Sequence, residues 1–257
     1  MSEILEPVTG MLPVYRILNR EENLNFFRNV LGLKVHLEEG AMVWLGGQTS
    51  KASCFLLEES PGVRSVNGAK KHGQTTLVAP AKEVTQLLSK NLAQVGKIYT
   101  DGTAYAFETR SPENDHFLIC SEGLSALTEM DKAQFTAVAV SDFAGLSDVK
   151  IKAIDFNVTD TALLDFLGHL LNGQATSTEL DFKGIDLRET VKTGSDLNAA
   201  SDETLDMEFL MFTVADAFDL TAFAQKFKEE NGYYLDKSGR TFSIEAPNNM
   251  DIWFVKI

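Results

Sequence analysis

Residues 19–33 read NREENLNFFRNVLGL, and this stretch carries the start and stop signals of a short amphipathic helix. Asn19 is a favoured N-cap residue, and Glu22 follows at the spacing of a capping box. One face of the predicted helix carries the apolar residues Leu24, Phe27, Val30 and Leu31. Gly32 suits the left-handed conformation that ends a helix, so the helix is expected to stop there.

Three further stretches of the chain have the same organisation. They begin at Pro80, Asp160 and Asp219, and they end before Gly96, at Asn172-Gly173 and at Asn231-Gly232. Successive closing glycines are separated by 64, 77 and 59 residues. This spacing indicates a repeat that was duplicated twice, with a longer joint in the middle.

Each predicted helix follows one predicted strand and precedes several others. The leading strands are expected at 12–18, 74–79, 151–158 and 208–214. The following strands are expected at 34–37, 41–45, 52–57, 95–99, 103–109, 116–120, 174–182, 186–191, 233–235, 241–245 and 251–255. Turn residues separate these runs, which gives four β-α-β-β-β repeats. The predicted fold class is α+β, with the repeats paired into two domains at 1–125 and 135–257.

The connecting segments are less clearly patterned. The joint between the domains is expected within 122–134, and residues 135–140 read as one extra strand. Segment 60–71 joins the first two repeats, and its Lys70-Lys71 pair is interpreted as part of a solvated loop.

Charge and composition exclude several classes of partner. The net charge is −14, of which −11 lies after residue 130, so nucleic acid and anionic membranes are not expected partners. No apolar stretch is long enough to span a bilayer, and the first residues lack the features of a signal peptide. A cytoplasmic protein is therefore expected, and action at the cell surface would need an unrecognised export route.

The repeat resembles the vicinal-oxygen-chelate superfamily, which includes glyoxalases, extradiol dioxygenases and antibiotic-sequestering proteins. The resemblance rests on the helix sequence FFRNVLGL at 26–33 and on the turns SPEN at 111–114 and APNN at 246–249. Those turns look like versions of the superfamily's Asp-Pro-Asp-Gly turn. The N-terminal half and the two-part layout are more closely similar to the streptococcal CppA family.

The CppA resemblance implies a function that the residue pattern does not show. That family is described as a candidate proteinase acting on a host complement glycoprotein (component three). Two alternatives stay open: a metal-independent protein that binds a small-molecule ligand, as antibiotic-sequestering proteins do, or a protein-binding scaffold without catalysis.

The superfamily resemblance also implies where metal ligands would lie, on the first and last strands of each repeat. The first-strand positions correspond to Leu12, Gln74, Ala153 and Phe209, and the last-strand positions to Leu118, Trp253 and one of Cys54, Leu56 or Glu58. Only Gln74 and Glu58 keep the oxygen donors of a hard-metal ligand, and two weak donors do not hold a transition metal against water. We therefore expect no metal site and no other cofactor.

Motifs of the common proteinase classes are absent, which leaves cysteine chemistry. No His-Glu-x-x-His, Gly-x-Ser-x-Gly or Asp-Thr/Ser-Gly motif occurs. The candidate catalytic residues are Cys54 and Cys120 with His72 and His116. His116, Leu118 and Cys120 are every second residue of one predicted strand, so their side chains lie on the same face. Successive residues on a face are about 7 Å apart, which is too far for direct contact between a thiol and an imidazole without bending of the strand. The competing interpretation is that both cysteines are small buried apolar residues.

A ligand pocket, if present, is expected in the N-terminal domain. The candidate lining residues are Tyr15, Arg16, Gln74 and Tyr105, which lie on predicted strands. The alternative is that about half of such residues face the helices or solvent. Arg16 is the most informative, because a charged residue on a central strand needs a partner.

Overall fold

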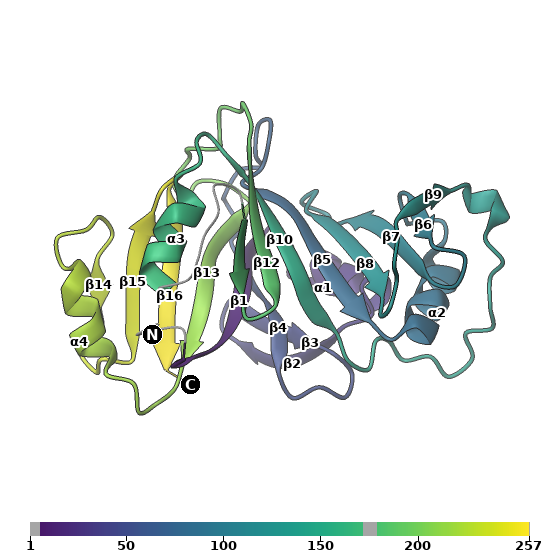
Figure 1. Ribbon diagram of the computed structural model, residues 1–257, viewed down its shortest axis with the longest axis horizontal. Coiled ribbons are helices and arrows are strands. Elements are labelled where there is room, and N and C mark those ends of the chain that lie inside the picture. Colours follow the sequence, from purple (N-terminus) through teal and green to yellow (C-terminus); the bar gives the residue numbers. More distant parts are fainter. Residues whose placement is uncertain (1–5, 172–178, 257) are drawn as a thin grey trace. The chain divides into compact units, whose positions relative to one another are not determined.

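The computed structural model describes residues 6–171 and 179–256, and it confirms an α+β protein built from repeats (Figure 1). The first repeat contains β1 (Val8–Ile17), α1 (Arg20–Asn25), η1 (Phe26–Val30), β2 (Lys34–Glu39), β3 (Met42–Gly46) and β4 (Ser53–Glu59). The second contains β5 (His72–Ala79), α2 (Ala81–Asn91), β6 (Ile98–Thr100), β7 (Tyr105–Arg110) and β8 (His116–Ser121).

The second half of the chain repeats this order, except that only two strands follow the helix of the third repeat among the described residues. The third repeat contains β10 (Lys150–Val158), α3 (Leu163–Leu171), β11 (Glu179–Phe182) and β12 (Ile185–Val191). The fourth contains β13 (Met207–Val214), α4 (Leu220–Ala224), η3 (Gln225–Phe227), β14 (Tyr234–Leu235), β15 (Thr241–Ala246) and β16 (Met250–Lys256). The predicted end of the third helix at Asn172-Gly173 and most of the strand predicted from 174 lie outside the described residues.

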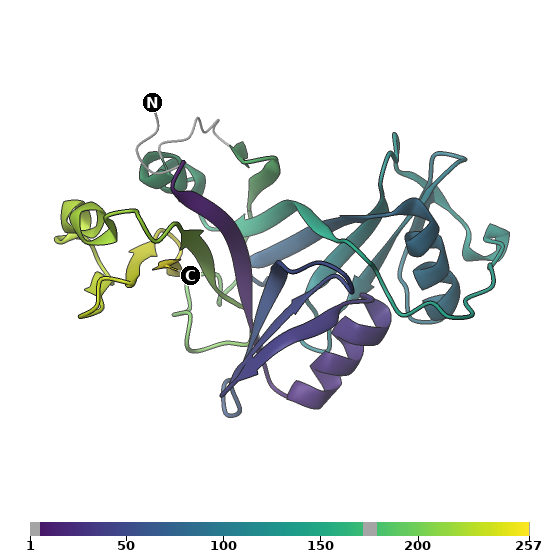
Figure 2. The same ribbon diagram turned by 90° about the horizontal axis from the view of Figure 1, so that it is seen from below.

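The fourth helical stretch ends at Phe227, before its predicted stop at Asn231-Gly232, whereas the signals of the first helix act as the sequence predicts. The Asn19 side chain accepts a hydrogen bond from the Glu22 backbone N–H at 3.1 Å, and Gly32 has a φ of 69°. Between them the helix widens into a π turn, in which the Leu31 N–H donates to the Phe26 carbonyl five residues earlier. In Figure 2 this purple helix lies beside the strands of its own repeat.

Two expectations for the connecting segments are wrong. Residues 135–140 form no strand, whereas Thr128–Met130 form β9, which pairs with β6. Lys71 is 2% exposed instead of solvated, and its ammonium group donates to the carbonyls of Ala199 and Asn249 at 2.6 Å each. These carbonyls lie far from Lys71 in the sequence, so no local sequence pattern predicts that Lys71 is buried.

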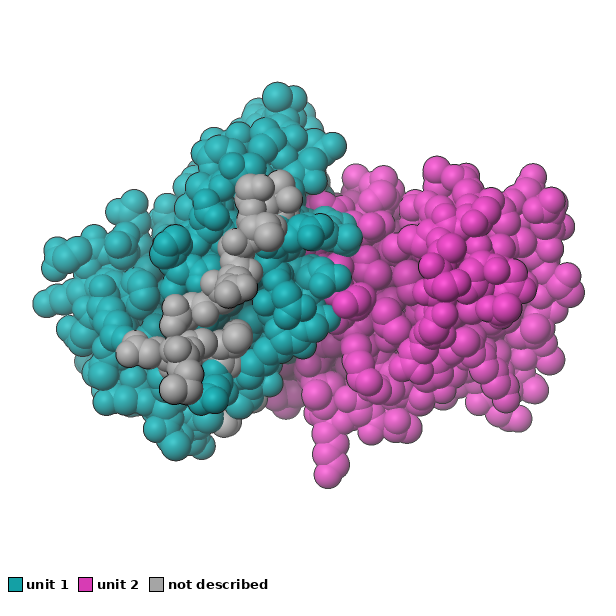
Figure 3. All heavy atoms as spheres, in the orientation of Figure 1, with its two compact units in different colours: residues 1–16, 62–71, 155–257 teal, residues 17–61, 72–154 magenta. Residues whose placement is uncertain are grey.

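The chain divides into two compact units that interleave along the sequence (Figure 3). Unit 1 consists of Met1–Arg16, Gly62–Lys71 and Asp155–Ile257, and unit 2 of Ile17–Pro61 and His72–Ile154. Both units therefore draw on both halves of the chain. The division of the sequence at 125–135 stays a prediction.

Unit 1 contains the strands of the fourth repeat in the order β14-β15-β16-β13, with β1 added beside β13. The first strand of the first repeat thus pairs antiparallel with the first strand of the fourth. Its core is aromatic, with Phe212 and Phe242 both stacked against Phe254 at 5.3 and 5.8 Å.

Unit 2 contains the sheet segments β4-β3-β2 and β5-β8-β7-β6-β9. β5 and β8 are parallel, and the neighbouring pairs β8–β7, β7–β6 and β6–β9 are antiparallel. The helix α2 buries Val84, Leu87 and Leu88. No helix in the described part of the chain is long and apolar enough to cross a bilayer.

Candidate functional site

One face of the β5–β8–β7 segment in unit 2 collects several of the predicted site residues. Thr76 is the register partner of Leu118, and Leu118 is in turn the partner of Glu108. Paired residues lie on the same side of a sheet, and side chains alternate along each strand. We call this side the Gln74 face, and it consists of Gln74, Thr76, Val78, His116, Leu118, Cys120, Ala106, Glu108 and Arg110.

Gln74 and Leu118 occupy the positions at which the superfamily resemblance implies metal ligands. Leu118 has no donor atom, and neither do the equivalent residues Leu12, Ala153 and Phe209. Within residues 6–171 and 179–256, no group of three or more His, Cys, Asp or Glu side chains is placed to hold a metal ion. The donor set of this chain does not fit a metal of the superfamily type.

Both candidate cysteines are free thiols in apolar surroundings. Cys120 packs with Ala106 and Leu118 on the Gln74 face, and Cys54 lies on β4. Burial raises the pKa of the Cys54 thiol to about 12 and that of the Cys120 thiol to about 11. A nucleophilic cysteine needs the opposite shift, because the thiolate is the reactive form.

We expect the two thiols to be unreactive in the folded protein. Iodoacetamide labelling of Cys54 and Cys120, followed by mass spectrometry, should be slow near neutral pH. The rate should rise about tenfold per pH unit from about pH 6 to pH 9 without a plateau, because the thiolate fraction grows until the pH reaches the pKa. The same protein in denaturant is the control and should label rapidly. A fast reaction that levels off near neutral pH would show that one thiol is activated.

His72 is placed in a buried polar network that the sequence did not reveal. Its Nε2 lies 3.0 Å from the Thr75 hydroxyl, and its Nδ1 lies 3.3 Å from an oxygen of Asp115. The other Asp115 oxygen accepts a hydrogen bond from the Ser111 hydroxyl at 2.9 Å. Hydroxyl, imidazole and carboxylate thus follow in the order of a catalytic triad.

This network is closed to a macromolecular substrate. Thr75 is 0% exposed, and His72 and Asp115 are 3% and 2% exposed. The His72 ring also packs against Phe117, with centroids 5.8 Å apart. The network satisfies buried polar groups in the way that folded proteins require. The sequence signals for it are the candidate residue His72 and the turn at 111–114, and neither indicates Asp115 or Thr75 as a partner.

The other predicted pocket residues are distributed over the two units. Tyr15 is 1% exposed on β1 in unit 1. Arg16 has a partner, as expected: its guanidinium pairs with Glu208 and donates to the Ser201 carbonyl at 2.9 Å. Tyr105 lies on the side of β7 opposite the Gln74 face, together with the fully buried Phe107. Its ring contacts that of Phe135.

The hollows of unit 2 include three that are formed by residues between 18 and 132. A hollow of about 680 Å³ is lined by residues 18–21, 24, 25, 28 and 59. The Met130 hollow, of about 570 Å³, is lined by residues 96–98 and 129–132. The Arg110 hollow, of about 360 Å³, is lined by residues 94–97, 108–110 and 116. The last two share Gly96 and Lys97, so they adjoin each other near the start of β6.

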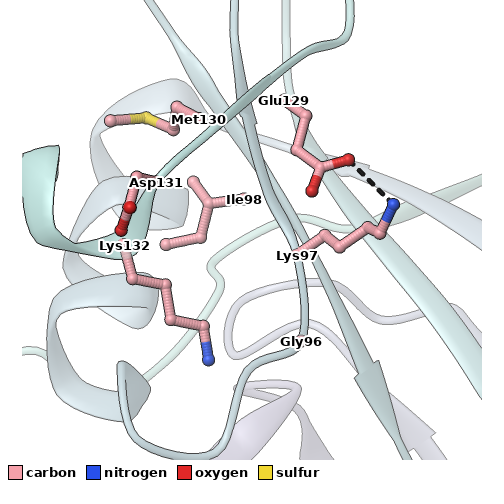
Figure 4. A pocket seen from close by; sticks show the side chains of 7 residues that line it. All are labelled: Gly96, Lys97, Ile98, Glu129, Met130, Asp131 and Lys132. Atoms are coloured by element: carbon pink, nitrogen blue, oxygen red, sulfur yellow. Dashed lines mark hydrogen bonds and ion pairs between the residues drawn. The ribbon is translucent and has the colours of Figure 1, made fainter.

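Figure 4 shows how charge is arranged in the Met130 hollow. Lys97 and Glu129 form an ion pair at 2.8 Å. Lys132 donates to the Val95 backbone carbonyl. Both cations are therefore engaged by groups of the protein itself.

The Arg110 hollow differs, because it includes part of the Gln74 face. Arg110 and His116 are register partners on β7 and β8, so their side chains are neighbours. Burial lowers the pKa of His116 below its ordinary value, and the positive charge of Arg110 adds to this effect. The imidazole is consequently neutral at physiological pH and able to donate or accept one hydrogen bond.

Comparison with known proteins agrees with this architecture. The chain is similar to the crystal structure of the cppA protein from Streptococcus pneumoniae, with 28% identity, a TM-score of 0.79, and coverage of 98% of this chain and 99% of that one. It also shares its fold with glyoxalase I from Zea mays, with 11% identity, a TM-score of 0.58, and coverage of 100% and 92%. No curated protein matches the chain.

Two family models account for most of the sequence. The model of the CppA N-terminal domain matches residues 11–130, and the model of the CppA C-terminal domain matches residues 146–254. Together they span both halves in the expected order. On this evidence the chain belongs to the CppA family and has a glyoxalase-like fold.

Proposed function

We propose that this CppA-family protein binds a complement glycoprotein (component three) without cleaving it. The partner is the one on which the family is described as acting. The mode of action follows from the residues that the structure describes, among which both candidate cysteines and the Thr75–His72–Asp115 network are buried.

The observation that carries this proposal is the burial of the two thiols, which raises the pKa of each. A cysteine proteinase requires a thiolate beside an imidazole at the surface of a substrate cleft. Cys54 and Cys120 are each only 9% exposed, and burial raises the pKa of both. Neither thiol is hydrogen-bonded to a histidine among the residues that the structure describes: His72 contacts Asp115 and Thr75 instead.

The Thr75–His72–Asp115 network offers no alternative nucleophile. A hydroxyl that attacks a peptide carbonyl must approach it to about 3 Å, and no such contact is open to a side chain with no exposed surface. The network therefore supports a structural role for His72, which agrees with a protein that acts by binding.

The proposal is tested by measuring binding and cleavage in one set of samples. Purified component three is incubated with the wild type, Cys54→Ala, Cys120→Ala and Thr75→Val, each with and without a chelator. We expect saturable binding to immobilised wild-type protein and intact component-three chains on gels in every sample. An unrelated glycoprotein serves as the binding control.

Two results would overturn the proposal. One is cleavage by the wild type that disappears in a single variant whose circular dichroism is unchanged, since that variant would identify a nucleophile. The other is the lack of saturable binding at micromolar concentration.

A second candidate function is metal-independent binding of a small molecule. The Arg110 hollow favours it, because its volume of about 360 Å³ falls within the range of small-molecule sites. Part of its lining belongs to the Gln74 face, where the polar side chains of Gln74, His116 and Arg110 adjoin the apolar Leu118.

A further inference from the structure

The Arg110 guanidinium is a cation without a carboxylate partner among the residues that the structure describes. Its Nη1 donates to the Asn114 side-chain oxygen at 2.7 Å. Asn114 lies in the turn between β7 and β8 with a φ of 67°. Within the described residues, the other donors of the guanidinium form no hydrogen bond or ion pair with a carboxylate.

The other charged groups of the Arg110 hollow also have hydrogen-bond partners. The Glu108 carboxylate accepts a hydrogen bond from the Tyr99 hydroxyl at 2.5 Å. Lys97 is bound to Glu129 at 2.8 Å on the side of the Met130 hollow. In a protein with a net charge of −14, an arginine left without a carboxylate is the exception. The Arg110 guanidinium can therefore bind an anion from outside without first breaking an ion pair of the protein.

His116 complements this arginine. It is the register partner of Arg110, and its side chain lines the same hollow. A neutral imidazole donates one hydrogen bond to an anion without adding a charge that would repel the guanidinium. Val95, which is 4% exposed, gives the hollow an apolar wall.

We propose that the Arg110 hollow binds a small molecule through its carboxylate or phosphate group. The anion is held by the guanidinium fork of Arg110 and by His116, and the apolar part of the ligand lies against Val95. Arginine is suited to this role because its planar donors match the two oxygens of a carboxylate or phosphate. The inference deepens the second candidate function, on which it rests.

The test uses three fluorinated probes of similar size and shape, monitored by fluorine NMR on the whole protein. They are 4-fluorobenzoate, 4-fluorophenyl phosphate and the neutral 4-fluorobenzamide. We expect at least one anion to bind the wild type, and the neutral probe to bind more weakly. Arg110→Gln should weaken binding of that anion about tenfold or more, because it removes charge-assisted hydrogen bonds to the ligand.

Two controls separate this effect from general damage. Arg28→Gln removes another arginine of unit 2, one whose side chain is 47% exposed and lies 3.9 Å from Glu38, and binding should be unchanged. Arg110→Lys keeps the charge but loses the fork, so it should bind with intermediate affinity. The His116 imidazole gives an independent reading, because a bound anion favours the imidazolium and should raise the pKa of His116 in the wild type.

Binding of only one anionic probe supports the proposal and identifies carboxylate or phosphate as the preferred group. Equal binding of all three probes, equal binding to the wild type and Arg110→Gln, or no binding at millimolar concentration overturns it. The probes test only the binding of small molecules, so a negative result does not bear on the proposed binding of component three.

Discussion

Phe117→Ala should lower the free energy of unfolding of unit 2 by about 3–5 kcal/mol, as expected for a phenylalanine removed from a packed core. Phe117 is 0% exposed and lies at the centre of an aromatic cluster. Ring centroids between 5.6 and 5.9 Å from it belong to Phe26, Phe27, Phe55 and His72. The cluster joins the helix of the first repeat to strands of the first and second repeats, so the cavity cannot collapse without moving several elements.

The two tryptophans make this effect measurable in unit 2 alone. Trp44 belongs to unit 2 and Trp253 to unit 1. In a Trp253→Phe background, which keeps an aromatic ring stacked on Phe209, fluorescence during urea unfolding reports on Trp44. Leu127→Ala, at a side chain that is 51% exposed, is the control and should change stability by less than about 0.5 kcal/mol. A Phe117→Ala loss no larger than that of the control would show that the cluster does not hold unit 2 together.

Arg16→Met should destabilise unit 1 by about 3–5 kcal/mol, because it removes one partner of a buried ion pair. The side chains of Arg16 and Glu208 are only 13% and 9% exposed, and each lies on a strand of the β1–β13 pair. Methionine keeps much of the side-chain volume, so the loss reports on the charge left behind on Glu208.

The measurement follows Trp253 fluorescence in a Trp44→Phe background. Arg16→Met/Glu208→Met should be more stable than Arg16→Met alone, because the double variant leaves no isolated buried charge. Arg64→Met is the matched control in unit 1: Arg64 also pairs with a carboxylate, that of Asp196, but its own side chain is 52% exposed. Its effect should be smaller, since solvent screens exposed pairs. A double variant as unstable as the single one would contradict the ion-pair explanation.

Local signals predicted the elements of this protein well. The capping interaction of Asn19, the stop at Gly32 and the alternation along β7 and β8 depend on neighbours within a few residues. They therefore follow from the sequence. The predicted strand at 135–140 is wrong because an apolar run is not enough: a strand also needs a free sheet edge. The edge beside β6 is taken by Thr128–Met130.

The candidate site was predictable only in part. Strand alternation was enough to place His116, Leu118 and Cys120 on one face, and the pairing of β5 with β8 adds Gln74 to it. The sequence gives no sign of Arg110, because nothing in its local context shows that no carboxylate pairs with it. The role of His72 was also hidden, since its partner Asp115 is 43 residues away.

The sequence by itself determined the α+β repeats, the boundaries of the first helix and the loss of metal-ligand side chains, since each of these depends on residue identity and short-range spacing. Tertiary structure alone decided that β1 pairs with β13, that Lys71 is buried against distant carbonyls, and which charges are left unpaired. Those outcomes depend on contacts between residues more than a hundred positions apart, as with Lys71 and Ala199. Many pairings of apolar strands satisfy the same local pattern, and only the packed core selects one of them.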